Sequence, residues 1–224
     1  MDIKKNLDEI KINIPQRIKL VAVSKTKTTE VILEAYRCGQ KVFGENKVQE
    51  LINKHDQLPD DIEWHFIGHL QSNKVKYIAP FVQMIHAIDS LKILKTVNKE
   101  AGKNDRVIPC LLQFHIALES TKFGLSEEEA RIILSSEEFK NMKNVTIAGV
   151  MGMATFTENT DQIRLEFRKL KDIFCRLKMD FFPDDREFKE ISMGMSDDYT
   201  VAIEEGSTMV RIGSNLFGKR NEHD

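Results

Sequence analysis

A lysine follows directly on an apolar run near the start of the chain. The stretch KLVAVSKTKTT places Lys25 after the apolar residues 20–23 and Ser24. A lysine whose amine is withdrawn from water has a lowered pKa and can form a Schiff base with a carbonyl group. Taken alone, Lys25 could equally be a solvated surface lysine without any chemical role.

Two later segments carry the residue types that bind phosphate. The segment SMGMSDD contains Ser196, and the segment MVRIGSNLFG contains Gly213 and Ser214. Glycine lets the backbone approach a phosphate, serine donates from its hydroxyl, and a following helix adds oriented N–H groups. Taken singly, these residues could be ordinary loop glycines and helix caps. Because both segments follow successive strand-like runs, together they favour a phosphate site.

An arginine precedes the second of these segments. Arg211 lies two residues before Gly213, and side chains alternate along a strand, so both face the same way. A buried arginine needs an acceptor, which could be a ring nitrogen of a ligand or a carboxylate such as Glu190. The lysine and the phosphate residues together indicate a ligand with an aldehyde and a phosphate, for which pyridoxal 5′-phosphate (PLP) is the obvious candidate. A charged arginine disfavours a proton on the ring nitrogen, so such a site would support only restrained carbanion chemistry.

Eight apolar or β-branched runs alternate with helical patterns and must position these residues. Helix signals include Gly39 as a helix end, a capping-box pattern from Ser126 to Glu129, and apolar spacing within 161–179. The alternation predicts an α/β fold: one domain over residues 1–224, a single-domain (β/α)8 TIM barrel with an extra N-terminal helix. An open doubly wound sheet is the alternative, which the absence of a GxGxxG after the first run disfavours. The expected strands cover 18–24, 41–44, 64–68, 83–88, 107–114, 145–151, 188–193 and 208–213.

Closure of such a barrel makes its last strand the neighbour of its first. Sites in this fold lie on the loops after the carboxyl ends of the strands, and phosphate usually binds after strands 7 and 8. Lys25 follows the first run, whereas Ser196 and Ser214 follow the seventh and eighth. We therefore expect these residues to converge on one mouth of the barrel.

Composition bounds the class of protein. The chain has 224 residues, of which 41% are hydrophobic and 30% charged, and this is ordinary for a globular protein. A formal net charge of −2 predicts no nucleic-acid partner, and no apolar run is long enough for a membrane span or a secretory signal. The 3 cysteines are widely spaced, which fits a reducing compartment. We therefore expect a cytoplasmic protein.

Several motifs of the sequence resemble the pyridoxal phosphate homeostasis protein family (YggS/PROSC type). The matching stretches are LVAVSKTK, FGENKVQE, WHFIGHLQSNK, STKFG, GVMGMA and ISMGMSDDYTVAIEEGSTMVRIGSNLFG. The resemblance implies a PLP-binding barrel of fold type III, like the N-terminal domain of alanine racemase. It also implies that PLP is held as an internal aldimine on Lys25.

The resemblance assigns cofactor-binding roles to further residues. Phosphate contacts map onto Ser196, Gly213 and Ser214, and the contact to the ring nitrogen maps onto Arg211. Other strand ends are expected to line the same mouth with Asn46, His69 and Met151.

The family's function implies buffering and delivery of PLP rather than catalysis. Alanine racemases need a second base from an additional domain, and the short segment after Gly213 leads us to expect no such domain here. The three tyrosines, Tyr36, Tyr77 and Tyr199, all fall in helical segments, so none is expected to replace that base. The expected partners are PLP and PLP-dependent apo-enzymes, and a monomer is favoured over a dimer. The alternatives are a fold-type III amino-acid racemase and a PLP-independent Schiff-base aldolase.

Two smaller features bear on the site. Release of the cofactor requires another amine, and Lys27 and Lys122 are candidates, although both could be ordinary solvated lysines. His65 and His69 have the spacing of a helical metal pair but straddle the end of an expected strand, so we predict no metal site.

Overall fold

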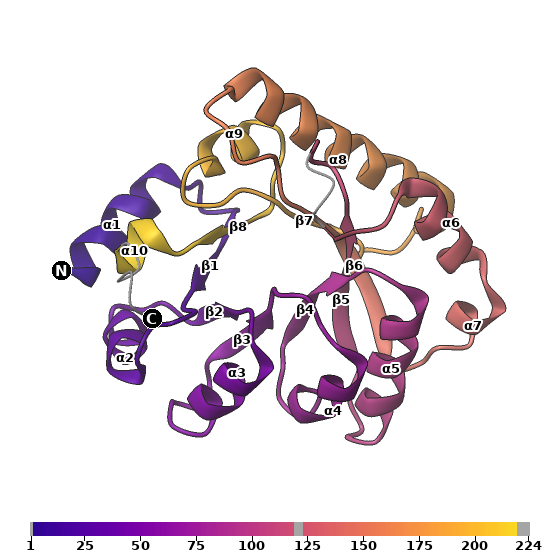
Figure 1. Cartoon of the computed structure of the whole chain (residues 1–224), viewed down its shortest axis with the longest axis horizontal. Coiled ribbons are helices and arrows are strands. Elements are labelled where there is room, and N and C mark those ends of the chain that lie inside the picture. Colours follow the sequence, from indigo (N-terminus) through magenta and orange to yellow (C-terminus); the bar gives the residue numbers. More distant parts are fainter. Residues whose placement is uncertain (1, 119–122, 219–224) are drawn as a thin grey trace.

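The computed structural model describes residues 2–118 and 123–218, which form a closed barrel of parallel strands (Figure 1). Each strand pairs with the next along the chain, and β8 pairs with β1 to close the sheet. This arrangement confirms the predicted barrel. The strands are β1 (Lys19–Val23), β2 (Val42–Glu45), β3 (Glu63–Phe66), β4 (Met84–Ile88), β5 (Ile108–Phe114), β6 (Val145–Gly152), β7 (Glu190–Ser192) and β8 (Met209–Ile212).

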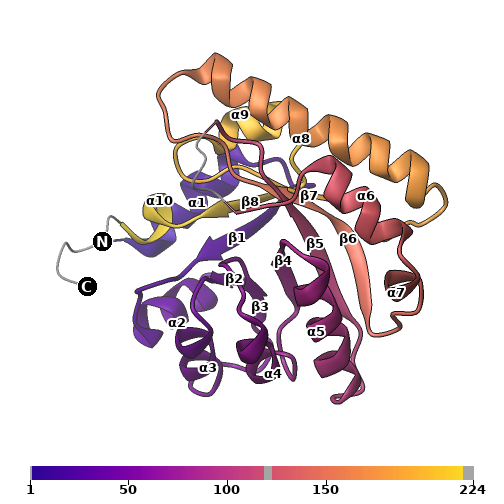
Figure 2. The ribbon, with the colours of Figure 1, turned by 45° about the vertical axis from the view of Figure 1, so that its right-hand side comes forward.

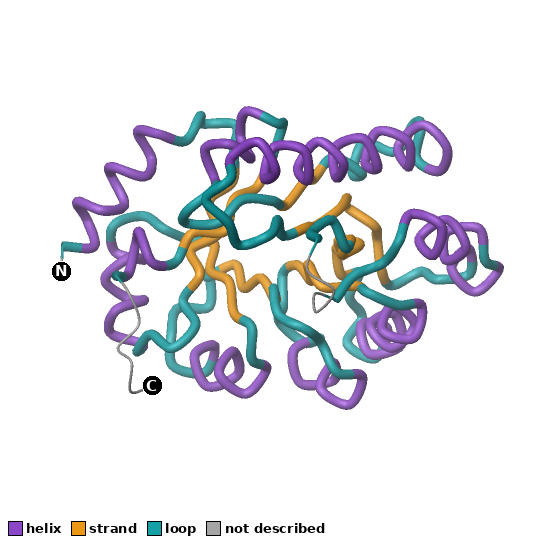
Figure 3. Tube along the Cα trace, turned by 45° about the horizontal axis from the view of Figure 1, so that its top comes forward, coloured by secondary structure: helices purple, strands orange, loops and turns teal. Residues whose placement is uncertain are grey.

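Helices surround the strands on the outside of the barrel (Figure 3). The predicted N-terminal helix is α1, which lies against α10 near the closure of the barrel, where Asn6 Nδ2 donates to Leu216 O at 3.0 Å (Figure 2). The helices are α1 (Ile3–Asn13), α2 (Thr29–Arg37), α3 (Val48–His55), α4 (Val75–Ile78), α5 (Leu91–Gly102), α6 (Glu127–Ser135), α7 (Glu137–Lys140), α8 (Thr160–Phe181), α9 (Tyr199–Glu204) and α10 (Ser214–Phe217), with a 3₁₀ turn at Ser72–Lys74.

The expected strand ends agree with the structure to within one residue, except that β3 ends at Phe66 instead of residue 68 and that β7 is shorter than expected. The capping box at the start of α6 is present, since Ser126 and Glu129 exchange hydrogen bonds between side chain and backbone. Residues 188–193 were expected to form a strand, but β7 covers only Glu190–Ser192, and Phe188 before it packs on Phe182 at a ring-centroid distance of 4.3 Å. Helix α9 starts at Tyr199, and residues 195–198 before it form a turn in which Asp198 N donates to Met195 O at 3.2 Å.

The core has two parts. Most buried apolar side chains lie between the strands and the surrounding helices, as expected for strands covered by crossover helices. A second, smaller cluster fills the inside of the barrel: Val21, Met84, Ala87, Leu111, Ala148, Met151 and Met209. The inside of the barrel is therefore filled by side chains, and the carboxyl ends of the strands form a mouth above this inner cluster.

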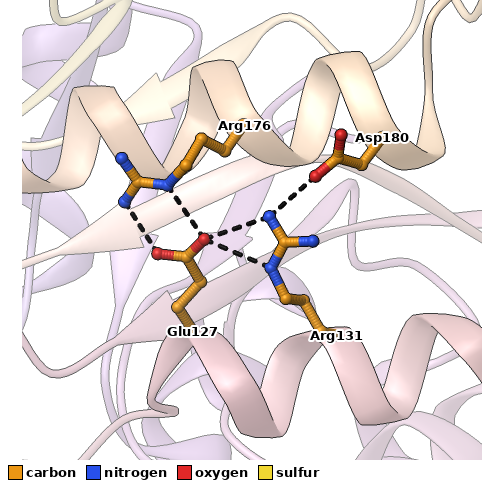
Figure 4. A network of polar contacts seen from close by, with 4 residues as sticks. All are labelled: Glu127, Arg131, Arg176 and Asp180. Atoms are coloured by element: carbon orange, nitrogen blue, oxygen red, sulfur yellow. Dashed lines mark hydrogen bonds and ion pairs between the residues drawn. The ribbon is translucent and has the colours of Figure 1, made fainter.

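An ion-pair network joins two of the outer helices (Figure 4). Glu127 at the start of α6 accepts from Arg176 of α8 at 2.7 Å and from Arg131 at 3.2 Å. Arg131 in turn donates to Asp180 at 2.7 Å. The network holds α6 and α8 side by side on one flank of the barrel.

No helix within residues 2–118 and 123–218 combines the length and the apolar character that crossing a bilayer requires.

Candidate cofactor-binding site

A cavity of about 490 Å³ lies at the carboxyl ends of the strands. Its walls include apolar side chains such as Val23, Ile67 and Met195. Seven of the eight residues predicted to bind a cofactor line it: Lys25, Asn46, His69, Ser196, Arg211, Gly213 and Ser214. The structure thus brings together residues from both ends of the sequence, as closure of the barrel requires.

Lys25 lies in a tight turn that begins where β1 ends. The backbone N–H of Lys27 donates to Ser24 O at 3.0 Å, so Lys25 and Thr26 occupy the centre of the turn. Thr26 has a φ of 64°, in the left-handed region. From this turn the half-buried Lys25 lines the cavity.

The loops after β7 and β8 are tied to each other. The N–H of Gly213 donates to Ser196 Oγ at 3.2 Å, and Asn215 Nδ2 donates to Ser196 O at 2.8 Å. A Cβ atom at Gly213 would lie 3.2 Å from Val23 O, so glycine permits close contact between the end of β8 and the end of β1. The predicted phosphate residues therefore lie beside the turn that carries Lys25.

A buried aspartate shapes the loop after β7. Asp198 Oδ1 accepts from the N–H of Met195 at 2.5 Å, which closes the turn that contains Ser196. Burial raises the pKa of Asp198, while the Met195 hydrogen bond and the charge of Arg211 act in the opposite direction. Asp198 therefore fixes the loop without lining the cavity.

Arg211 is buried within β8 and reaches the cavity from the inside of the barrel. Its Nη1 donates to Ser192 Oγ at 2.6 Å, and its Nη2 donates to Gly152 O at 3.0 Å. Burial lowers the pKa of Arg211 to about 10, and the charge of Asp198 partly opposes this shift, so the guanidinium is protonated at neutral pH. The alternative pairing with Glu190 does not occur, since Glu190 accepts from Thr208 Oγ1 at 2.6 Å.

Two buried histidines, His86 and His65, continue the hydrogen bonds of Arg211 and Ser192 into the barrel. The sequence analysis did not predict this contact. His86 Nδ1 lies 3.0 Å from Ser192 Oγ, and His86 Nε2 lies 2.9 Å from His65 Nδ1. Burial lowers the pKa of His65 to about 3 and that of His86 well below its usual value, so both are neutral at neutral pH. Within the described ranges no three metal-binding side chains come together. Alternation along β3 and β4 was the available signal for these inward positions.

Met151 is the predicted site residue that the structure leaves outside the cavity lining. It is 1% exposed and belongs to the inner cluster of the barrel. Met153, two residues further along, lines the cavity instead. Both positions face inward, but the stagger of the strands places Met151 one layer below the mouth.

The remaining predicted residues differ in their surroundings. The ring of His69 stacks on Phe123 at a centroid distance of 4.5 Å, and its Nδ1 lies 3.1 Å from Asp89 Oδ2. Among the described residues Asn46 Oδ1 is buried and has no hydrogen-bond partner. Lys27 also lines the cavity, and Lys122 falls outside the described residues.

Comparisons with known proteins agree with this geometry. The family described as alanine racemase, N-terminal domain, matches residues 1–221. A pyridoxal phosphate homeostasis protein of Aquifex aeolicus (strain VF5) is 42% identical over 203 residues, which cover 90% of this chain and 87% of that protein. The structure of PipY, the COG0325 family member of Synechococcus elongatus PCC7942, without PLP is 32% identical and matches with a TM-score of 0.90, over 97% of this chain and 100% of that one. The PipY structure with PLP bound matches with a TM-score of 0.87, at the same identity and coverage.

The closed barrel and the family match define an α/β barrel of the alanine racemase N-terminal type. Within that class, the chain belongs to the pyridoxal phosphate homeostasis protein family. The resemblance seen in the sequence motifs is thereby confirmed. The relatives carry the name of a homeostasis protein and not that of an enzyme.

Proposed function

We propose that this protein binds PLP at the mouth of its barrel, with Lys25 as the point of covalent attachment, and holds it for transfer to other proteins. One observation carries the proposal. The primary amine of Lys25 lines the same cavity of about 490 Å³ as two loops with serine and glycine and a buried arginine, all of which lie far from Lys25 in the sequence. The amine can react with an aldehyde, the loops can bind a phosphate, and the arginine can donate to a ring nitrogen. PLP carries an aldehyde, a phosphate and a ring nitrogen.

The residues present fit that cofactor. Ser196 and Ser214 offer hydroxyls at the cavity, and Gly213 keeps the two loops close to the end of β1, where Lys25 follows. Arg211 uses two of its five donors in the hydrogen bonds described above, so others are available toward the cavity. The apolar side chains in the cavity wall suit an aromatic ring, and the polar residues Asn46 and His69 form other parts of the lining.

Bound PLP supplies an aldehyde that condenses with a primary amine and a ring that can accept electron density. Lys25 provides the amine. Arg211 remains protonated at neutral pH and would repel a second positive charge on the ring nitrogen, which weakens the ring as an electron acceptor. The site would therefore retain the cofactor while restraining carbanion chemistry.

We also propose that the role is carriage rather than catalysis. Tyr36 lies in α2, Tyr77 in α4 and Tyr199 at the start of α9, and no tyrosine of the described chain lines the cavity. A racemase would exchange the α-hydrogen of an amino acid with solvent. Incubation of the PLP-loaded protein with amino acids in deuterated water should give no exchange beyond that of free PLP, and faster exchange that requires Lys25 would show an enzyme.

Delivery and assembly are part of the same proposal. Lys27, whose Nζ lies 3.5 Å from Gly218 O at the cavity, is the described candidate for an assisting amine during transfer to apo-enzymes. The protein is proposed to act as a monomer, because one chain supplies every residue of the proposed pocket. Light scattering of the PLP-loaded protein tests the assembly state, and a stable dimer contradicts it.

The test of PLP binding is a visible absorbance spectrum of purified protein mixed with PLP. Wild-type protein should show the absorbance of covalently attached PLP, and Lys25→Ala should lose it. Lys140→Ala, which removes an exposed lysine on α7, is the matched control and should keep it. Reduction with borohydride followed by peptide mass spectrometry should place the adduct on Lys25. No binding by the wild-type protein, or an adduct that persists in Lys25→Ala, contradicts the proposal.

A further inference from the structure

The turn that carries Lys25 has an unfavourable backbone conformation at its centre. Thr26 has a φ of 64°, and the hydrogen bond from Lys27 N to Ser24 O makes it the third residue of a four-residue turn. A positive φ at that position is usually taken by glycine, and it is an outlier for a β-branched residue. Such a conformation persists only where surrounding contacts enforce it.

Those contacts come from a buried lysine on α3. Lys54 Nζ donates to Ser24 O at 2.8 Å, to Glu45 Oε1 at 2.7 Å and to Glu50 Oε1 at 2.6 Å. An ammonium group has three donors, so these bonds use all of them. The side chain of Lys54 is 6% exposed and that of Glu45 is 0% exposed. Lys54 therefore has a fixed position beneath the start of the turn.

The two carboxylates connect Lys54 to the rest of the turn. Glu50 Oε1 accepts from the N–H of Thr26 at 2.5 Å, and Glu45 Oε1 accepts from Ser24 Oγ at 2.6 Å. The strained residue and the first residue of the turn are thus both held by side chains of one cluster. Lys54, Glu45 and Glu50 do not themselves line the cavity in the described part of the chain, so any effect on a ligand must pass through the turn.

A purely stabilising role explains this cluster poorly. The three charged side chains of the cluster, two buried and one half-buried, lose hydration, and well-packed apolar side chains often serve stability as well as a buried ion pair does. The side chain of Glu45 is 0% exposed, so its hydration is lost, and burial raises its pKa while the charge of Lys54 acts against the shift. The hydrogen bonds of the cluster to the turn are directional, and apolar packing could not reproduce them.

We propose that Lys54, together with Glu45 and Glu50, is a positioning cluster that fixes the turn so that Lys25 presents its amine toward the cavity. The inference rests on the proposed function, in which Lys25 Nζ condenses with the aldehyde of PLP. In that step a C=N bond replaces the C=O bond, and the amine gives both of its hydrogens to the departing water. The cluster should therefore matter for covalent attachment and not for the contacts to phosphate and ring.

Two probes separate these contributions. PLP can attach to Lys25, whereas 4-deoxypyridoxine 5′-phosphate has a methyl group in place of the aldehyde and can make only the other contacts. Lys54→Met should weaken PLP binding by about tenfold or more and leave the affinity for the deoxy analogue within about twofold. Lys140→Met, at an exposed lysine that pairs with Glu137, is the control and should change neither affinity.

The state of the turn can be measured without any ligand. Amide hydrogen exchange at Thr26 should be about tenfold faster or more in cofactor-free Lys54→Met, because the cluster holds that N–H through Glu50. Glycine adopts a positive φ without strain. Adding Thr26→Gly to Lys54→Met should therefore restore part of the lost PLP affinity, and a merely structural role of Lys54 would not produce such rescue.

Each outcome decides between the explanations. Equal weakening of both probes shows a general structural role, and an unchanged affinity for PLP shows that Lys54 does not act on Lys25; either result overturns the inference. If wild-type protein does not bind PLP, the proposed function fails instead. If circular dichroism shows that Lys54→Met is unfolded, Glu50→Gln replaces it, because this variant keeps the side-chain shape but weakens the bond to Thr26. The same difference between the probes is then expected.

Discussion

Arg211 Nη1 and Ser192 Oγ lie 2.6 Å apart inside the barrel, where the arginine is 4% exposed. The same serine hydroxyl lies 3.0 Å from His86 Nδ1, which belongs to a pair of buried histidines. Burial lowers the pKa of His65 to about 3 and that of His86 well below its usual value, so both histidines are neutral at neutral pH. Burial also lowers the pKa of Arg211, but only to about 10, so the arginine stays charged. A neutral polar chain thus holds a charged side chain at the base of the cavity.

The first prediction removes this support. Ser192→Ala should lower the free energy of unfolding of the cofactor-free protein by about 1–3 kcal/mol, because it leaves a buried charged donor without a partner. It should also weaken PLP binding, because Arg211 loses one of the contacts that orient it. Urea unfolding and a PLP titration measure the two effects.

Ser126→Ala is the control for the loss of a serine hydroxyl. Ser126 caps α6 on the outside of the barrel, and its removal should cost about 1 kcal/mol of stability. PLP affinity should remain at the wild-type value in this variant. If Ser192→Ala binds PLP as well as Ser126→Ala does, Ser192 does not position Arg211.

The second prediction concerns pH. The pKa of His65 is about 3 in the folded protein against 6.5 as the ordinary value, so below pH 6.5 the unfolded chain binds a proton that the folded chain does not. The free energy of unfolding should therefore be independent of this histidine above pH 6.5 and should decrease as the pH falls from 6.5 toward 3. The slope should be about 1.4 kcal/mol per pH unit for each such histidine. Urea unfolding at several pH values between 7.5 and 5 measures it.

His65→Asn should reduce this slope by about half, because Asn keeps a polar atom near the position of Nδ1 but does not titrate, and His86 remains. His69→Asn, at the exposed mouth, controls for the loss of a histidine as such. A slope that is the same in His65→Asn and in the wild-type protein contradicts the assignment of two neutral buried histidines.

Much of the architecture could be read from the sequence, because each strand is a short apolar run between helical patterns. The convergence of Lys25 with Ser196 and Ser214 followed from barrel closure alone, since closure makes β8 the neighbour of β1. These predictions needed only the order and number of the strands, which local patterns determine.

The supporting contacts could not be read in this way. Ser192 and His86 meet across the barrel although 106 positions separate them, and their contact depends on strand stagger. Lys54 looks like the polar residue of an amphipathic helix, and its burial arises from the docking of α3 against β2. Met151 was expected at the mouth of the barrel but lies below it. Alternation along a strand predicts which side chains face inward, but it does not predict how far along the barrel axis each of them lies.

The third prediction concerns the network between α6 and α8. Hydrogen bonds from Arg176 lower the pKa of Glu127, so its stabilising contribution is present above about pH 4.5 and is lost at lower pH. The side chain is 27% exposed, so Glu127→Gln should cost less than about 1 kcal/mol at low salt. Urea unfolding should show that the difference from wild type shrinks at about 1 M salt. A large, salt-independent loss would indicate a packing role instead.

The fourth prediction compares two glycines with positive φ. Gly149 has a φ of 151°, and a Cβ atom there would lie 1.8 Å from Glu190 O, whereas Gly39 has a φ of 89° and open space around it. Gly39→Ala should cost about 1–2 kcal/mol from backbone strain alone. Gly149→Ala adds a steric clash with the start of β7 and should cost about 3 kcal/mol or more in urea unfolding. Because β7 also carries Ser192, the displaced strand should weaken PLP binding in Gly149→Ala but not in Gly39→Ala. Equal losses of stability in the two variants would mean that β7 moves aside freely, and Arg211 could not then owe its fixed position to that strand.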